Sequence, residues 1–361
     1  MKKVCKQLWI CAWVGLAPAL CHALAPALCH AQPQVTPASN STVIPSPSLT
    51  PKGPDTHQVA LMNLLECMEL YHPAKELKGA AVLSGSTTMM ALGKAWADRF
   101  RFFHKDVTLT RGPDGTEAGI KALAQDPTLI VGASRPITEA EIATLKAGKC
   151  KDPLSVIVGL DPLALYVHES NKLGAVTPEQ LEAILRAPGQ KLNHISTWGE
   201  LGATGEFAKQ PIRIHSRSEI SGTKAFVKQF LLRGDEVAKE AQSHESNDAV
   251  CEAIAKDPAG VGIAGFGDGK PGTRPVSLLI RGATIPATEE SFLTGQYPLV
   301  RPLILVFDRT QMKSDGGLRE SMLRYILSRD GQMEAIRAGF FPLDPSFIHQ
   351  ELDQICGPRM R

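Results

Sequence analysis

The chain has 361 residues, with 39 Lys and Arg against 37 Asp and Glu. Three of the lysines lie in residues 1–31, which carry no acidic residue, so the rest of the chain has 36 basic against 37 acidic residues. This balance excludes a protein that binds nucleic acid or another polyanion through a basic surface. The length predicts two domains.

Residues 1–31 have the features of a secretory signal peptide. A lysine-rich start is followed by an apolar stretch from Leu8 to Leu20 and then by small residues, so we predict cleavage after Ala23 or Ala31. A membrane span is the weaker alternative, because the stretch is short and contains Pro18. Lipid attachment is weaker too, because a leucine rather than a small residue precedes each nearby cysteine. We therefore expect a periplasmic protein.

The next segments lead into the folded region. Residues 32–55 are rich in Pro, Ser and Thr and predict a disordered tether. Leu61, Leu64, Leu65 and Met68 recur at helical spacing and predict a helix over about 57–70. The cysteines beyond the signal peptide allow either two disulfides, Cys67 with Cys356 being one pairing, or buried thiols; they are Cys67, Cys150, Cys251 and Cys356.

Strands alternate with helices in the folded region. Apolar runs at 80–83, 107–110 and 129–131 predict strands, separated by helices that end near 101 and cover 117–125. This alternation predicts an α/β fold with a parallel sheet and helices on both faces. The apolar run 156–167 predicts a strand that crosses into a second lobe. There, Thr177-Pro178 predicts a helix start, 212–215 a strand, and the residues up to about 232 a helix.

Glycine stands beside hydroxyl residues at three predicted strand-to-helix junctions. These are Ser84–Thr87, Gly115-Thr116 and Ser221–Thr223. A helix N-terminus offers unpaired N–H groups, glycine lets an anion approach the backbone, and hydroxyls add donors. Ordinary helix capping explains one such junction, whereas three of them indicate a site for a small oxyanion.

Two arginines are candidate counter-charges for that anion. A guanidinium group matches an oxyanion with two parallel hydrogen bonds, and Arg217 and Arg135 each lie close to a junction. The alternative is that each arginine is a surface residue or pairs with a nearby carboxylate, Glu219 or Glu139.

The sequence predicts no metal site, no cofactor and no enzymatic activity. The histidines lack ligand spacing, and neither GxxxxGK[ST] nor GxSxG occurs. The segment 260–265 fits GxGxxG by letter, but it is predicted to form a strand rather than to follow one.

The chain resembles the substrate-binding proteins of phosphate ABC transporters from about Gly79 to Leu343. The family has glycine–hydroxyl loops, a Ser-Asp or Ser-Arg pair after the third strand, an arginine loop ending in Ser-Gly-Thr, and several motifs without an obvious ligand role. The corresponding segments here are Gly85–Thr87, Gly115-Thr116, Ser134-Arg135, Arg217–Thr223, Trp198–Leu201, Tyr297–Leu303, and Gly331-Gln332 through Pro342-Leu343.

The resemblance implies a two-lobed type II periplasmic-binding-protein fold. Each lobe would be a mixed sheet flanked by helices, with the ligand cleft between the lobes and crossing strands near 161–168 and 297–307. Lobe one would comprise 56–165 and, after lobe two at 166–266, the returning segment 267–361. Such a protein is expected to be a monomer that binds inorganic phosphate and delivers it to a membrane permease.

The resemblance also implies the ligand contacts. They are Ser86, Thr87, Thr116, Ser134, Arg135, Arg217, Ser221, Gly222 and Thr223. Glu219 replaces the family's aspartate that orients the arginine. Arg135 stands where some members have an aspartate that accepts the proton of monohydrogen phosphate, so we hypothesise that Glu117 or Asp161 is the acceptor here. A site without an acceptor would not separate phosphate from sulfate.

Three alternatives to phosphate capture stay open at this point. The ligand is another oxyanion, such as sulfate or molybdate; or the chain is a secreted phosphatase; or it is an adhesion protein that kept the fold and lost the ligand.

Overall fold

The structure is a computed structural model that describes residues 56–189 and 194–356. The predicted signal peptide and tether, residues 1–55, lie outside the described residues. Across the described ranges, no helix combines the length and the apolar character that a membrane crossing needs.

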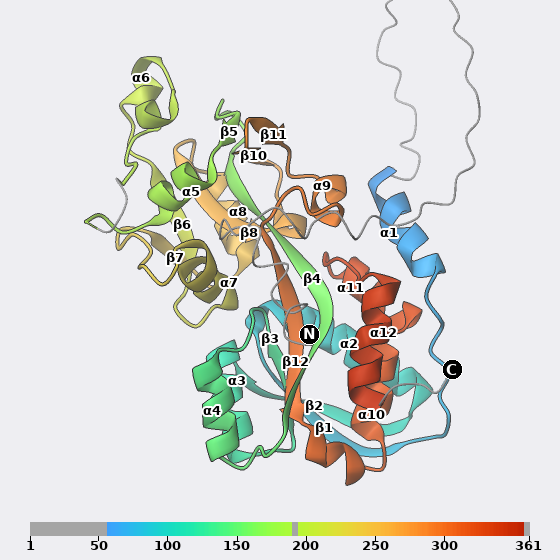
Figure 1. Cartoon of the computed structure of the whole chain (residues 1–361). Helices are drawn as coiled ribbons and strands as arrows, with labels where there is room; N and C mark the ends of the chain where they lie inside the picture. The colour runs from blue at the N-terminus through green and yellow to red at the C-terminus, as the bar shows by residue number, and fades with distance from the viewer. Residues whose placement is uncertain (1–55, 190–193, 357–361) are drawn as a thin grey trace, which may run out of the picture. The chain divides into compact units, whose positions relative to one another are not determined.

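The first half of the sheet is parallel, as the alternating pattern predicts. β1, β2 and β3 lie in the order β2-β1-β3 with parallel pairing (Figure 1). The elements are α1 (Thr56–Glu66), β1 (Lys78–Gly85), the 3₁₀ turn η3 (Thr87–Met89), α2 (Met90–Phe103), β2 (Asp106–Asp114), α3 (Thr116–Gln125), β3 (Leu129–Ala133) and α4 (Glu139–Ala147). The three predicted strands and the helices between them are confirmed, whereas α1 ends earlier than predicted.

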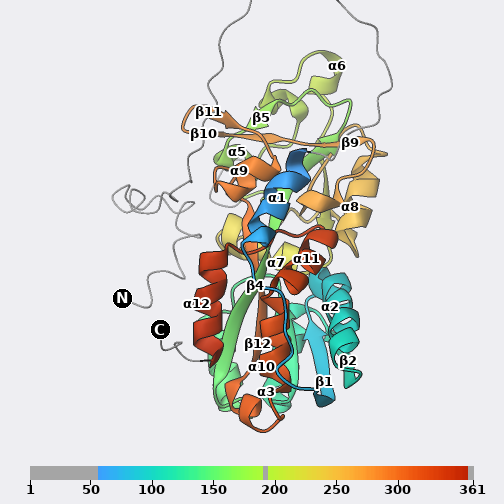
Figure 2. The ribbon, with the colours of Figure 1, turned by 90° about the vertical axis from the view of Figure 1, so that its right-hand side faces the viewer.

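Two long antiparallel strands connect the halves of the sheet. They are β4 (Pro153–His168) and β12 (Val300–Asp308), and β12 lies between β3 and β4. The far end of β4 pairs with β8 (Gly260–Gly265), which continues to β6 (Arg213–Arg217) and β7 (Gln242–His244). Figures 1 and 2 show both long strands running from the half that contains α3 toward the half that contains α8.

The second half carries its own helices and a small second sheet. The helical elements are α5 (Pro178–Leu185), η4 (Trp198–Leu201), α6 (Gly205–Ala208), α7 (Gly222–Phe226), the π-helical turn η5 (Val227–Leu231), α8 (Asn247–Ile254), η6 (Phe266–Asp268) and α9 (Glu289–Leu293). The small sheet has the order β11 (Ala283–Ile285), β10 (Ser277–Ile280) and β5 (Ala175–Val176).

The return to the first half begins later than the predicted residue 267. β9 (Thr273–Pro275) pairs with residues 166–168 of β4, and β10 pairs with β5, so both strands belong with the second half. The chain re-enters the first half with β12. The predicted boundary fails because the short strands after 267 add edge pairings to the second half.

The chain ends in helices that pack on the first half of the sheet. After η7 (Arg309–Lys313) come α10 (Leu318–Ile326), α11 (Arg329–Arg337) and α12 (Pro345–Cys356). One core joins Leu65 of α1, Trp96 of α2, Tyr325 of α10 and Ile348 of α12. A second core lies under α3 and α4, so helices cover both faces of the sheet (Figure 1). Both ends of the described chain thus pack against the first half.

The sequence left two alternatives for the cysteines, disulfides or buried thiols, and two of the described cysteines have the second. Cys150 and Cys251 are buried free thiols, and burial raises the pKa of each to about 12. Cys67 is exposed and unpaired among the described cysteines. The side chain of Cys356 lies outside the described residues, so its pairing with Cys67 stays a prediction.

Candidate anion-binding site

The loops that follow β1 and β3 meet at one edge of the sheet. Parallel neighbouring strands end on the same side, and this places Ser86 beside Ser134. Both side chains are buried, and the Ser86 hydroxyl donates to Ser134 Oγ at 2.9 Å. The loop before α3 joins them, since the Gly115 N–H donates to the Gly85 carbonyl at 2.7 Å. Gly115 has φ +93°, a conformation that favours glycine.

Helix capping does not account for the hydroxyls at the first two junctions. Ser86 occupies the N-cap position of η3 without a side-chain capping bond. Thr87 Oγ1 and Thr116 Oγ1 are buried and have no hydrogen-bond partner among the described residues. A buried hydroxyl left unpaired costs about 1–3 kcal/mol, so these groups suit a ligand better than they suit the local backbone.

The third junction combines a cap with a close backbone approach. Ser221 caps α7 by accepting from the Thr223 N–H at 3.1 Å. A Cβ at Gly222 would overlap Ser134 Oγ and would lie 3.5 Å from Thr116 Oγ1. Gly222 is therefore one point at which the second half of the described molecule closely approaches the loops of the first.

Arg217 is the last residue of β6, and among the described residues no carboxylate contacts its guanidinium group directly. It is 4% exposed and donates to Asn247 Oδ1 at 2.6 Å, to the Glu245 carbonyl at 2.8 Å and to the His244 carbonyl at 3.3 Å. Burial lowers the pKa of Arg217, and the nearby Arg301 guanidinium lowers it further. Both effects describe a buried cation that an anion would stabilise.

Arg301 is a site residue that the sequence analysis missed. It is fully buried in β12, and its Nε and Nη2 donate to Asp161 Oδ2 at 2.8 and 2.6 Å. Nη2 also reaches Thr223 Oγ1 at 2.9 Å and Thr88 Oγ1 at 3.3 Å, whereas Nη1 has no partner in the described chain. The sequence did contain a sign of this site, namely an arginine and an aspartate inside two apolar runs. Such charged residues are buried almost only where they pair with each other or bind a ligand.

Asp161 is a buried carboxylate that pairs with Arg301. It is 2% exposed and sits opposite Arg301 in the β4–β12 pairing. Burial raises the pKa of Asp161, although Arg301 and Arg217 oppose that shift. Of the two acceptors predicted from the sequence, Asp161 has the required burial and neighbours.

Three of the predicted side chains point elsewhere. Glu117 is 71% exposed and pairs with Lys121 on the surface of α3, so it is not the buried acceptor. Glu219 is 82% exposed and pairs with Lys224, so it does not orient Arg217. Arg135 donates to both oxygens of Glu141, at 2.8 and 2.7 Å, and its charge is neutralised there rather than at the anion site.

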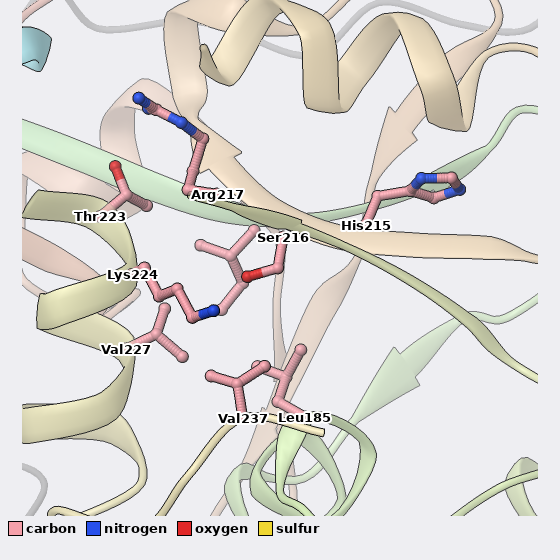
Figure 3. A pocket seen from close by; sticks show the side chains of 9 residues that line it. Leu185, His215, Ser216, Arg217, Thr223, Lys224, Val227 and Val237 are labelled. Atoms are coloured by element: carbon pink, nitrogen blue, oxygen red, sulfur yellow. The ribbon is translucent and has the colours of Figure 1, made fainter. Parts of the chain in front are cut away.

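The pocket in Figure 3 lies on the other side of β6. Ser216 and Lys224 face it above an apolar lining that includes Leu185 and Val237, whereas Arg217 and Thr223 extend away from its centre. The pocket therefore adjoins the anion site and shares Arg217 and Thr223 with it, but its centre lies among other side chains. Among the residues that the structure describes, no group of three or more His, Cys, Asp or Glu side chains is arranged to hold a metal ion.

Comparisons with known proteins agree on one kind of fold. A family model described as a PBP superfamily domain matches residues 72–329. The phosphate-binding protein PstS of Pseudomonas aeruginosa is 26% identical over 290 residues, which are 79% of this chain and 90% of the relative. Protein SphX of Synechococcus elongatus is 23% identical, over 75% of this chain and 79% of its own length.

Solved structures give the same result. A putative phosphate ABC transporter substrate-binding protein with bound phosphate from Clostridium perfringens has a TM-score of 0.60 at 24% identity, covering 73% of this chain and 100% of its own. An ABC-type phosphate transport receptor from Vibrio cholerae has a TM-score of 0.59 at 21% identity, with coverage of 73% and 100%. These similarities confirm the two-lobed type II binding-protein fold.

Proposed function

The chain belongs to the PBP superfamily, and on that premise we propose that it is an extracytoplasmic solute-binding protein that captures inorganic phosphate for an ABC transporter. One observation carries the proposal. Loops and a strand near Gly222 and Arg217 carry buried hydrogen-bond donors that have no protein partner in the described chain. These donors are Thr87 Oγ1, Thr116 Oγ1 and Arg301 Nη1.

The charges of the site favour a small divalent anion. Two buried guanidinium groups, Arg217 and Arg301, lie close to one directly paired carboxylate, Asp161. The helix starts at Thr116 and Gly222 add partial positive charge, worth about 0.3–1 kcal/mol each and more when dry. A tetrahedral oxyanion accepts hydrogen bonds in several directions at once and therefore matches donors that come from both halves.

Asp161 gives the site a means of selecting a protonated anion. Both of its Arg301 contacts go to Oδ2, and Oδ1 is the oxygen that would accept the proton of monohydrogen phosphate. Sulfate carries no proton at neutral pH, so it would leave this acceptor unpaired or repel it. A buried group left unpaired by the wrong ligand is a strong source of selectivity.

The two halves of the sheet act as lobes that close on the anion. β4 and β12 connect them, and the Gly222–Ser134 approach and the Arg301–Thr223 hydrogen bond join them at the site. Bound anion would favour this closed arrangement, because it contacts donors from both lobes only when they meet. The protein works as a monomer without catalysis, is exported through residues 1–31 to the periplasm, and passes its ligand to a membrane permease.

Titration calorimetry of the purified protein, stripped of ligand by unfolding and refolding, tests the proposal. We expect phosphate to bind with micromolar or tighter affinity and sulfate to give no heat. Binding of both anions would indicate a broader oxyanion receptor and would remove the role of Asp161. Silence from both would overturn the proposal, and a chromogenic phosphate ester would then separate a phosphatase from an adhesion protein.

A further inference from the structure

We infer that Asn247, anchored by Asp268, is the positioning residue that aims Arg217 at the anion and holds Thr223, in the first turn of α7, beside it. The resemblance implied that Glu219 orients the arginine, but the structure places Glu219 on the surface. The inference rests on the proposed function, since it concerns how the same site is prepared for phosphate.

One amide oxygen contacts both residues. Asn247 is the first residue of α8 and is 8% exposed. Its Oδ1 accepts from Arg217 Nη1 at 2.6 Å and from Thr223 Oγ1 at 3.3 Å. Arg217 ends β6 and Thr223 lies in the first turn of α7, so a single side chain fixes the relative positions of two elements that line the site.

Asp268 determines which way the amide faces. Asn247 Nδ2 donates to Asp268 Oδ2 at 2.9 Å, and a carboxylate in its ionised form can only accept. The amide nitrogen must therefore face Asp268, and the oxygen must face the two donors. Asp268 follows β8 in η6, so the anchor comes from the strand beside β6.

An amide holds Arg217 without neutralising it. The contrast within this chain is Arg135, which a carboxylate holds with two hydrogen bonds and which takes no part in the site. The carboxylate of Asp268 is separated from Arg217 by the side chain of Asn247, so it does not pair with the guanidinium group directly. The guanidinium group is thus aimed by a hydrogen bond while its charge stays available to an anion.

The experiment compares four variants with the wild-type protein. They are Asn247→Ala, Asn247→Asp, Asp268→Asn and the exchange Asn247→Asp/Asp268→Asn. Phosphate affinity is measured by calorimetry from pH 5.5 to 8.5. Each affinity is expressed relative to that of wild type at the same pH, so that the effect of phosphate ionisation on binding cancels. Thermal unfolding of each variant is followed in parallel.

We expect Asn247→Ala to weaken phosphate binding at least about 30-fold, as is usual when one partner of a buried charge-assisted contact is removed. Asn247→Asp places two carboxylates face to face, so its relative affinity should fall as pH rises and the proton shared between them is lost. The exchange variant restores one donor and one acceptor between positions 247 and 268. Its relative affinity should stay below wild type, because the carboxylate now contacts Arg217 directly, but it should exceed that of Asn247→Asp at pH 8 and should no longer vary with pH.

The outcomes separate this inference from the function on which it rests. Silence of the wild-type protein toward phosphate overturns both. Binding by wild type together with unchanged affinity in Asn247→Ala overturns the inference alone. The inference is also overturned by three results together: Asn247→Ala loses binding, Asn247→Asp has a flat pH profile, and the exchange variant does not recover. That combination would mean that Asn247 is needed only for the folding of the start of α8.

Discussion

Arg135 and Arg217 occupy similar places in the two halves of the molecule, and only one of them is available to a ligand. Each lies at or just after the end of a strand, β3 or β6, and they are 7% and 4% exposed. Arg135 meets the carboxylate of Glu141, whereas Arg217 meets an amide oxygen and two carbonyls. Burial is the same, so the charge of the partner decides the role.

The physical reason is that hydrogen bonds and charge are separable. A carboxylate fixes a guanidinium group and cancels its charge, which leaves nothing to attract an anion. A neutral oxygen orients the guanidinium group equally well. It leaves the positive charge buried, with little water around it and available to an anion. Arg301 stands between these cases, because Asp161 pairs two of its nitrogens while Nη1 has no partner in the described chain.

The largest expected effect is the loss of binding in Arg217→Met. Removing a buried charge-assisted contact costs about 2–5 kcal/mol, and since 1.4 kcal/mol is tenfold, phosphate affinity should fall at least about 30-fold in calorimetry. The control is Lys224→Met, which removes the same charge seven positions later from a side chain that faces the pocket behind β6 (Figure 3). Equal losses in the two variants would show that net charge rather than geometry binds the anion.

Asp161→Asn should change the selectivity of the site for phosphate over sulfate. The amide can turn its nitrogen toward the anion and donate to an unprotonated oxygen, so sulfate should begin to bind. Phosphate binding should weaken about 5- to 150-fold, because the loss of a well-placed buried acceptor costs about 1–3 kcal/mol. Competition between the two anions measures the ratio. A variant that still ignores sulfate and binds phosphate normally would place the acceptor elsewhere.

Gly222→Ala tests the contact between the two halves. The added Cβ would overlap Ser134 Oγ, which is fully buried and already bonded to Ser86. Overpacking of this kind costs about 1–3 kcal/mol. The cost falls on the closed arrangement, so phosphate should bind about tenfold more weakly while the melting temperature of the ligand-free protein stays close to wild type. An unchanged affinity would mean that the halves do not meet this closely around the ligand.

The sequence predicted the local parts of this architecture well. Strand and helix periodicity located the first three strands, and the glycine–hydroxyl junctions indicated Ser86 and Thr116. Ser134 was predicted only from the family resemblance. The role that the resemblance implied for Glu219 is wrong, because its side chain lies in solvent and pairs with Lys224 although it is only two positions from Arg217.

Two residues that the sequence analysis missed, Arg301 and Asn247, are brought to the site from a distance. Arg301 and Asp161 are 140 positions apart and meet through the register of two antiparallel strands, which no local pattern contains. Asn247 lies 30 positions from Arg217 and reaches it because β7 and β6 run side by side. The return boundary at 267 failed for a related reason, since short edge strands leave almost no periodic signal.

Arg135→Met should leave phosphate affinity within about twofold of wild type and should destabilise the fold. The pair with Glu141 is buried, with side chains 8% and 16% exposed, and removing one partner leaves a carboxylate without its cation. Breaking such a pair costs about 3 kcal/mol, which denaturant unfolding would detect. A large loss of affinity in a variant that remains folded would return Arg135 to the site and would undo the contrast with Arg217.

The smallest expected effect is on the pH dependence of the free energy of unfolding, which also distinguishes Arg135 from Arg217. Burial favours a higher pKa for Glu141, but hydrogen bonds from Arg135 and Thr138 outweigh it and hold the pKa below its ordinary value. The unfolded chain therefore takes up this proton first as pH falls. The stabilising contribution is present above about pH 4.5 and is lost as pH falls through the lower folded-state pKa. Glu141→Gln should thus be less stable than wild type at pH 7, and the difference should shrink below pH 4. A Glu141→Gln difference that is constant with pH would mean that shape, rather than the ionised pair, provides the stability, and Arg135 would then be no more neutralised than Arg217.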